Sequence, residues 1–223
     1  MELEKFFLMR HELVLLVIAM IVLIGEISSD ENKKWNIYPI TLVLFLLHTI
    51  AGFFPSLDYG ELFGGMYHAS PLTIMMKNCL NIGVFIILLQ CSDWFKKLSE
   101  SNRMTEVLLL LLSTLIGMYF MISSGDFLMF YMGLELATLP IAALAAYETT
   151  KERSAEAGIK LILSAALSSA ILLMGITFMY AIAGNLYFDG FSQHLDGSAL
   201  QITGFIFFTA GIGFKISAVP FHL

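Results

Sequence analysis

Seven apolar stretches, separated by short polar segments, divide the chain. A helix needs about 20 predominantly apolar residues to cross the hydrocarbon core of a bilayer. The predicted spans cover residues 12–27, 35–54, 70–92, 104–123, 126–147, 157–183 and 199–222. This pattern predicts an all-α, polytopic transmembrane helix bundle of about seven helices.

The first stretch has one feature of a signal peptide, because Lys5 and Arg10 precede its apolar run. No small-x-small cleavage site follows it, and six further spans do. We therefore expect it to be the first transmembrane helix.

Composition supports the membrane interpretation. Of 223 residues, 58% are hydrophobic and 13% charged, against about 25% charged in soluble domains. The mean hydropathy is +0.81. The sequence has neither a basic patch for nucleic acid nor a glycine-rich phosphate loop, and no spacing typical of a metal site. Cys79 and Cys91 lie on one predicted helix, about 18 Å apart, so they are not expected to pair.

The basic residues of the loops predict an orientation, because lysine and arginine concentrate in cytoplasmic loops. The loops near 55–69, 123–126 and 184–198 contain neither residue. The N-terminus is therefore expected outside, and the loop after the first helix in the cytoplasm or its organellar equivalent. The membrane is expected to be a bacterial inner (plasma) membrane. The basic residues of the opposite loops are Lys33, Lys34, Lys96, Lys97, Arg103, Lys151 and Arg153.

Two charges within the spans stand beside helix breakers. Glu135 lies five residues before Pro140, and Lys215 five residues before Pro220. An intramembrane charge is costly, and a proline leaves a backbone carbonyl without its helical partner. Opposite charges beside a loosened backbone are typical of a proton path. The alternatives are a structural hydrogen bond for Glu135 and extension of the Lys215 amine to the membrane surface.

Lys160 and His222 are further candidates for proton transfer. Ser164 and Ser168 follow Lys160 at four and eight residues, so the three form a polar stripe along one side of the predicted helix. Lys160 could instead extend its amine to the membrane surface. His222 follows Lys215 by seven residues, and an imidazole ordinarily exchanges protons near neutral pH; it could also be interfacial. Structural or interfacial roles are expected for three other polar residues, Glu26, His48 and Lys77.

Three motifs carry a resemblance to a known family. They are Met-Gly-Leu-Glu-Leu-Ala-Thr-Leu-Pro at 132–140, Gly-Ile-Lys-Leu-Ile-Leu-Ser-Ala-Ala-Leu-Ser-Ser-Ala-Ile-Leu-Leu-Met-Gly at 158–175, and Gly-Phe-Lys-Ile-Ser-Ala-Val-Pro-Phe-His at 213–222. With them, the chain resembles subunit N of respiratory complex I, the proton-translocating NADH:quinone oxidoreductase. The resemblance extends from about 104 to 223.

The resemblance implies an antiporter-like fold of fourteen helices with two inverted repeats, each containing a broken helix. Glu135 would be the helix 5 glutamate, Lys160 the helix 6 lysine, Lys215 the lysine of broken helix 7, and His222 the histidine after Pro-Phe. Residues 1–223 would form a single transmembrane domain, with helices 1–3 in 1–103 and a truncated first repeat in 104–223.

The resemblance also implies a function. The chain would translocate protons as a subunit of the oxidoreductase, without redox chemistry or a cofactor of its own. NADH, FMN, iron–sulfur clusters and quinone would be bound elsewhere in the complex. The partners would be other complex I membrane subunits, above all neighbouring antiporter-like subunits, and the lipid bilayer. The alternatives are a subunit of a multi-subunit Na+/H+ antiporter or membrane-bound hydrogenase, and a structural or assembly subunit without conduction.

Overall fold

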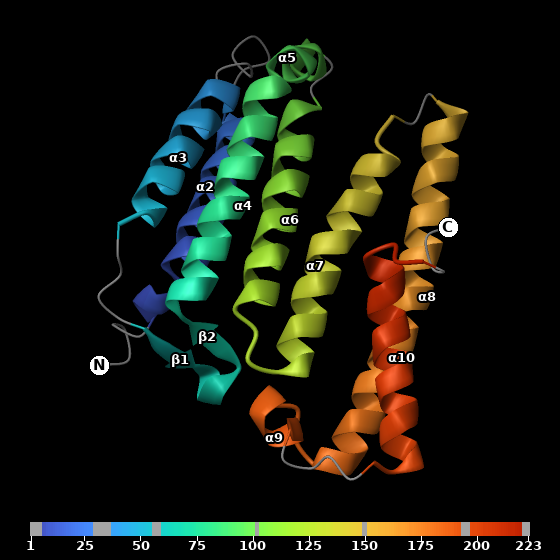
Figure 1. Cartoon of the computed structure of the whole chain (residues 1–223). Helices are drawn as coiled ribbons and strands as arrows, with labels where there is room; N and C mark the ends of the chain where they lie inside the picture. Colours follow the sequence, from blue (N-terminus) through green and yellow to red (C-terminus); the bar gives the residue numbers. More distant parts are fainter. Residues whose placement is uncertain are drawn as a thin grey trace.

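A computed structural model describes residues 6–28, 37–54, 59–100, 103–148, 151–192 and 197–219. Long helices run side by side through this part of the chain (Figure 1), as the apolar pattern predicted. They are α2 (Arg10–Ser28), α3 (Ile37–Gly52), α4 (Pro71–Gln90), α6 (Met104–Ile122), α7 (Phe127–Ala145), α8 (Glu152–Ala183) and α10 (Ala199–Lys215).

Among the described residues, five helical segments are long and apolar enough to cross a membrane: Phe7–Ser28, α4, α6, α7 and α8. Helices α3 and α10 are apolar but shorter. Large apolar side chains also cover the outer faces of the bundle, where a soluble protein would carry polar groups; they include Ile24, Leu47 and Leu163, which are 57%, 57% and 64% exposed. The chain is an integral membrane protein.

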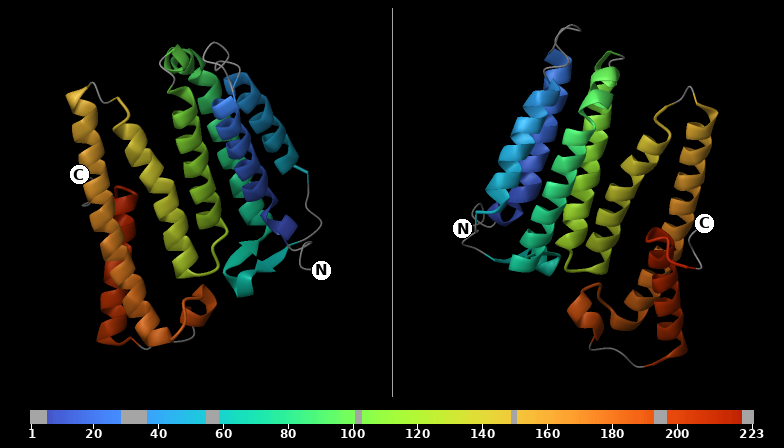
Figure 2. Two further views of the ribbon diagram at one scale, coloured as in Figure 1. Left: turned by 180° about the vertical axis from the view of Figure 1, so that it is seen from behind. Right: turned by 45° about the horizontal axis from the view of Figure 1, so that its top comes forward.

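The helices form two groups that meet at the α6–α7 pair. Helices α2, α3 and α4 pack beside α6, whereas α8 and α10 lie on the other side of α7 (Figure 2). Helices α6 and α7 approach closely because glycines face the contact: a Cβ at Gly117 would lie 2.3 Å from the backbone nitrogen of Ala137. Small residues at such a seam allow direct backbone contact, the usual basis of helix association in membranes.

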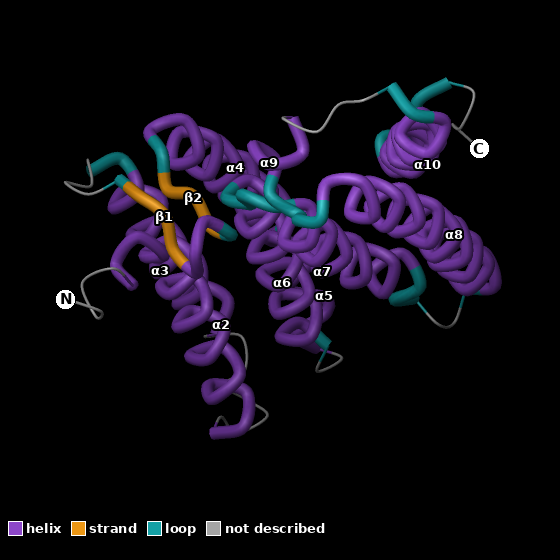
Figure 3. Tube along the Cα trace, turned by 90° about the horizontal axis from the view of Figure 1, so that it is seen from below, coloured by secondary structure: helices purple, strands orange, loops and turns teal. Residues whose placement is uncertain are grey.

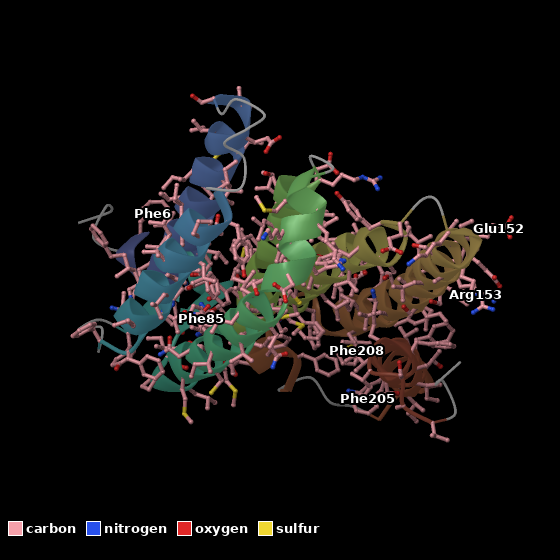
Figure 4. All side chains as sticks on the ribbon, turned by 90° about the horizontal axis from the view of Figure 1, so that it is seen from above. Phe6, Phe85, Glu152, Arg153, Phe205 and Phe208 are labelled. Atoms are coloured by element: carbon pink, nitrogen blue, oxygen red, sulfur yellow. The ribbon has the colours of Figure 1, made fainter. Side chains whose placement is uncertain are left out.

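Helices α8 and α10 use the same kind of seam. A Cβ built at Gly175 of α8 would lie 2.5 Å from the backbone nitrogen of Phe208, and one at Gly211 of α10 would lie 2.7 Å from the Cα of Leu172. Viewed from below, α10 lies directly against α8 (Figure 3). Phe208 turns into the bundle and packs on Phe127, with ring centroids 5.5 Å apart, whereas Phe205 points outward (Figure 4).

Short elements occur where only connecting loops were expected. A hairpin pairs β1 (Gly60–Leu62) with β2 (Tyr67–Ala69) in one connection of the all-α bundle that the sequence predicted. The 3-10 turns η1 (Phe7–Met9) and η3 (Phe63–Gly65) and the short helices α5 (Ser92–Glu100) and α9 (Phe188–Ser192) complete the described elements. The predicted span 70–92 therefore ends at Gln90, and α5 crosses the end of the bundle (Figure 1).

The connection between α6 and α7, residues 123–126, is bonded to the hairpin. The backbone N–H of His68 donates to the carbonyl of Ser123 at 2.8 Å, and that of Gly125 donates to the carbonyl of Met66 at 2.7 Å. A Cβ at Gly125 would lie 2.0 Å from the carbonyl oxygen of Gly65, so the contact requires glycine.

The same connection also reaches the segment before α9. The backbone N–H of Phe127 donates to the carbonyl of Leu186 at 3.0 Å. The carboxylate of Asp126 caps α7 by accepting the N–H of Met129 at 2.7 Å, which satisfies one of the free donors of the first helical turn. Backbone hydrogen bonds thus link three connections at this end of the bundle.

Helix α10 ends earlier than the sequence predicted. The span 199–222 was expected to break near Pro220, which lies outside the described residues, but the helix stops at Lys215. Ser217 has a φ of 52°, and the N–H of Ala218 donates to the carbonyl of Gly213 at 2.9 Å. This is a Schellman motif with serine in the left-handed position, so α10 ends at Lys215 in a capped turn.

Candidate functional site: a charged pair between α7 and α10

Glu135 lies in the middle of α7, nine residues after the capping Asp126. Pro140 is inside the same helix and has no N–H, so the carbonyl of Leu136 has no helical donor. The sequence therefore places a carboxylate and a loosened stretch of backbone within two turns of each other.

Lys215 meets this carboxylate from the last turn of α10. Its Nζ lies 3.0 Å from Glu135 Oε1 and 3.3 Å from the hydroxyl oxygen of Thr138. The side chains of Lys215 and Glu135 are 8% and 22% exposed, so the amine is turned into the bundle and does not extend to the surface. A cation at a helix C-terminus is also stabilised by the free carbonyls there.

A third helix contributes to the same carboxylate. The hydroxyl of Ser169 in α8 lies within hydrogen-bond distance of both Glu135 Oε1 and the carbonyl oxygen of Ala165, and its one proton can be donated to either. Sequence reasoning missed Ser169, because the predicted polar stripe passed through Ser164 and Ser168. The signal available was the pair Ser168–Ser169, which presents hydroxyls on two adjacent faces of α8.

A cavity of about 250 Å³ opens beside the pair, between α7, α8 and α10. Its polar lining comes from Lys215, Thr138, Ser164, Ser168 and Ser217, and the remaining lining side chains are apolar. Such a space holds several water molecules, and hydroxyls and an amine provide the partners that bound water needs.

Lys160 is not part of this arrangement. Its Nζ lies 2.5 Å from Glu156 Oε1, and its side chain is 74% exposed. Eight residues turn an α-helix by about 80° beyond two full turns, so Ser168 can face the cavity while Lys160 faces outward. His222 lies outside the described residues.

A second buried charged pair contains one of the residues expected to be structural or interfacial. The Lys77 side chain is 2% exposed, so it is not interfacial, and its Nζ lies 2.5 Å from Glu12 Oε1, a contact compatible with the structural role. His48 is also buried, with Nε2 3.3 Å from the Tyr119 hydroxyl. Glu26 accepts a hydrogen bond of 2.6 Å from Thr105. The sequence signal for the Glu12–Lys77 pair was that a negative and a positive residue each lie near the start of a predicted span, and that both starts face the same side of the membrane.

The described part of the chain contains no group of three or more His, Cys, Asp or Glu side chains that could hold a metal ion. The chemistry that the α7–α10 site offers is proton transfer: a carboxylate, an amine, hydroxyls and space for water.

Comparison with known proteins identifies the family. Residues 124–223 match the family described as NADH:quinone oxidoreductase/Mrp antiporter, TM. NADH-quinone oxidoreductase subunit N of Phocaeicola vulgatus is 40% identical over 223 residues, which are 100% of this chain and 47% of that protein. The subunit N of Azobacteroides pseudotrichonymphae is 40% identical over 226 residues, again 100% of this chain and 47% of the relative. The chain thus spans about half the length of these relatives.

Solved structures show the same fold. A structure of respiratory complex I from Thermus thermophilus with bound aureothin contains a chain that superposes with a TM-score of 0.73 at 22% identity, over 95% of this chain and 45% of that one. An archaeal membrane-bound sulfane sulfur reductase gives a TM-score of 0.77 at 17% identity, over 96% and 45%. Matched over its whole length to subunit N relatives, this chain belongs to the antiporter-like family of NADH-quinone oxidoreductase subunit N.

Proposed function

We propose that this chain acts within a proton-translocating membrane subunit of an NADH:quinone oxidoreductase, and that Glu135 and Lys215 carry the proton transfer. The observation that carries the proposal is the 3.0 Å contact between these two side chains, inside the bundle and beside a cavity. A purely structural ion pair would not need a cavity lined with hydroxyl groups next to the amine.

The geometry suggests how the pair handles a proton. While Glu135 is ionised, it attracts the Lys215 ammonium; the interaction of two unit charges at 3.0 Å is about 5.5 kcal/mol at an effective dielectric constant of 20. Weakening this contact favours release of a proton from Nζ to water in the cavity. Restoring the contact favours uptake of a proton by the neutral amine.

The broken end of α10 makes such a change possible. Lys215 is followed at once by the capped turn at Ser217, so the amine is held by one terminal turn and not by a continuous helix. Terminal residues that absorb backbone changes are the usual hinges of small movements.

Lys160 and His222 are proposed to extend the path beyond the pair. Lys160 would exchange its exposed contact with Glu156 for the polar stripe of Ser164, one turn away. His222 would follow the helix break after Lys215. Electron transfer from NADH through FMN and iron–sulfur clusters to quinone would occur in other subunits.

The proposed setting is a bacterial inner membrane with the N-terminus outside. The basic residues Lys96, Lys97, Arg103, Lys151 and Arg153 belong to segments at one end of the bundle, opposite the hairpin (Figure 1). Neighbouring antiporter-like subunits would cover part of the exposed apolar surface, and lipid would cover the remainder.

A double-mutant cycle in the intact complex tests this proposal. Glu135→Gln and Lys215→Ala should each depress NADH-driven proton pumping in membrane vesicles. The double variant should lose less pumping than the sum of the two single losses, because the two residues act as a unit. Lys215→Arg should also impair pumping, because arginine does not readily release its proton. Complex assembly is measured alongside.

Lys151→Ala is the matched control, since this lysine forms an exposed pair with Glu148 at the end of the bundle; its pumping should equal that of wild type. Additive losses in the cycle, or a fully active Lys215→Arg, would contradict the proposal. Loss of assembly without a specific loss of pumping would instead support a structural role.

A further inference from the structure

A second buried polar cluster lies at the hairpin end of the bundle, among helices that precede the Glu135–Lys215 site in the chain. Its centre is the pair Glu12–Lys77, whose side chains are 4% and 2% exposed and whose charged atoms lie 2.5 Å apart. The Tyr67 hydroxyl lies 3.1 Å from each carboxylate oxygen of Glu12 and accepts a hydrogen bond of 3.0 Å from Lys77 Nζ. Removing two charges from water is costly even when they are paired.

Tyr67 keeps a hydroxyl proton available to this pair. It lies in β2, outside the membrane-spanning helices. Burial, followed by the nearby Glu12 carboxylate, raises the pKa of the Tyr67 hydroxyl above its ordinary value. Tyr67 therefore remains a neutral hydrogen-bond donor to Glu12.

The cluster continues through four helices. Lys77 Nζ lies 5.6 Å from the centre of the Tyr119 ring. The Tyr119 hydroxyl donates to Asn81 Oδ1 and lies 3.3 Å from His48 Nε2. The ring of His11 lies 5.6 Å from that of His48 and 6.2 Å from that of Tyr119.

Several polar atoms of this cluster have no protein partner within the described residues. They are both ring nitrogens of His11, Oδ1 of Asn78 and Nδ2 of Asn81. His11 is 3% exposed and Asn81 0%. Leaving a buried polar group unsatisfied costs about 1–3 kcal/mol, and proteins normally satisfy such groups with internal water. The unpaired atoms therefore indicate bound water inside the cluster.

Asn78 lies between the cluster and a cavity at the end of the bundle. Asn78 lines a cavity of about 290 Å³ between the ends of α3 and α4, together with Tyr59 and Pro71. Its side-chain nitrogen donates to the carbonyl of Gly52 at 2.8 Å. A Cβ at Gly52 would lie 2.2 Å from Asn78 Oδ1 and 3.0 Å from His11 Cε1, so glycine lets these two polar side chains approach each other.

We propose that Glu12 and Lys77 form a second proton-exchange site, hydrated by bound water and open to the cavity beside Asn78. In the exchange, one proton leaves Lys77 Nζ for a bound water and passes along water past His11 to the cavity. The neutral amine then takes up a proton from the other side of the cluster, along water beside Tyr119 and His48, so that each cycle moves one proton through the site. The use of this site in pumping rests on the proposed function, but its hydration does not.

The first experiment replaces both charges with amides, as Glu12→Gln with Lys77→Gln in the intact complex. Replacing both partners removes the two buried charges together, whereas removing one leaves an uncompensated charge. We expect normal assembly and NADH oxidation with fewer protons pumped per NADH. A wild-type proton yield in the assembled double variant would overturn the proposal. The Glu12–Lys77 pair would then serve only to hold α2 and α4 together.

The second experiment detects the water in the unaltered complex, so that it does not depend on how a variant folds. Hydroxyl radicals generated from bound water by X-ray radiolysis should label Tyr119 and His11 despite their burial. Tyr38, 5% exposed and packed on Phe95 with ring centroids 5.1 Å apart, is the control and should stay unlabelled.

Equal absence of label at Tyr119 and Tyr38 would overturn the proposal. Loss of pumping in Lys215→Ala is measured in parallel. This measurement separates the two proposals. If the proposed function is wrong, Lys215→Ala pumps normally; if only the second site is wrong, Lys215→Ala still loses pumping.

Discussion

The position of Lys215 depends on a backbone contact one turn earlier in α10, at Gly211. A Cβ added there would lie 2.7 Å from the Cα and Cβ of Leu172 and 2.8 Å from its backbone nitrogen. Because two of these atoms belong to the backbone of α8, a side-chain rotation cannot relieve the clash. Carbon atoms in contact normally lie about 3.5–4.0 Å apart, so Gly211→Ala should push α10 away from α8 by about 1 Å.

The electrostatic consequence follows from the distance between the charges. If the shift acts along the line from Lys215 Nζ to Glu135 Oε1, their separation of 3.0 Å becomes about 4 Å. At an effective dielectric constant of 20, the attraction falls from about 5.5 to about 4.2 kcal/mol. A loss of about 1.4 kcal/mol is about tenfold in an equilibrium constant, and the direct hydrogen bond is lost as well.

We therefore expect Gly211→Ala to lower the rate of proton pumping by up to about tenfold, with the complex still assembled. The assay is NADH-driven proton uptake by inverted membrane vesicles, normalised to NADH oxidation. Gly204→Ala is a milder change on the same helix, with its nearest contact at 3.0 Å, the Cβ of Phe178. Gly83→Ala is the control, because a Cβ there meets nothing within 4 Å.

The expected order of pumping is Gly83→Ala equal to wild type, then Gly204→Ala, then Gly211→Ala. Wild-type pumping by an assembled Gly211→Ala complex would refute the reasoning, since the pair would then tolerate a displacement of its helix. An equal loss in all three variants would show that the effect does not come from the α8–α10 seam.

Two further predictions concern the orientation of the bundle in the membrane and the role of Lys160. Cysteines introduced at Lys97 and at Lys151 should react with an impermeant thiol reagent from the cytoplasmic side, and one at Tyr59 from the outer side; reaction of the first two from opposite sides would contradict the orientation. Lys160→Ala should lower pumping less than Lys215→Ala does, because Lys160 is largely exposed and paired with Glu156. A loss as large as that of Lys215→Ala would show that Lys160 belongs to the central path.

The apolar pattern predicted the long helices because each must cover itself with apolar side chains over about 20 residues. The ends of the helices were harder to predict. Helix α10 stops at Lys215 because Ser217 adopts a left-handed conformation, which is unusual for serine and is not signalled by its side chain. The hairpin has strands of three residues each, too short for an alternating pattern to be recognised.

The two charged pairs differ in how far the sequence could predict them. Glu135 and Lys215 are each followed by a proline at the same spacing, and this repetition marked both as candidates for a proton path. Glu12 and Lys77 are separated by 65 positions and carry no local motif. Only the packing of α2, α4 and the hairpin brings them together. The direction of Lys160 could not be predicted either, because it depends on the rotation of α8 against its neighbours.

The hydrogen bonds at residues 123–126 have a mechanical consequence. They fasten the turn between α6 and α7 to the hairpin and to the segment before α9, so this end of the bundle resists separation. Any change in the angle between α6 and α7 then grows with distance from the fastened turn. A helix of 19 residues is about 28 Å long, and a tilt of about 2° moves its far end by about 1 Å. Small rotations about a fixed base would thus widen or narrow the bundle mainly at the opposite membrane face.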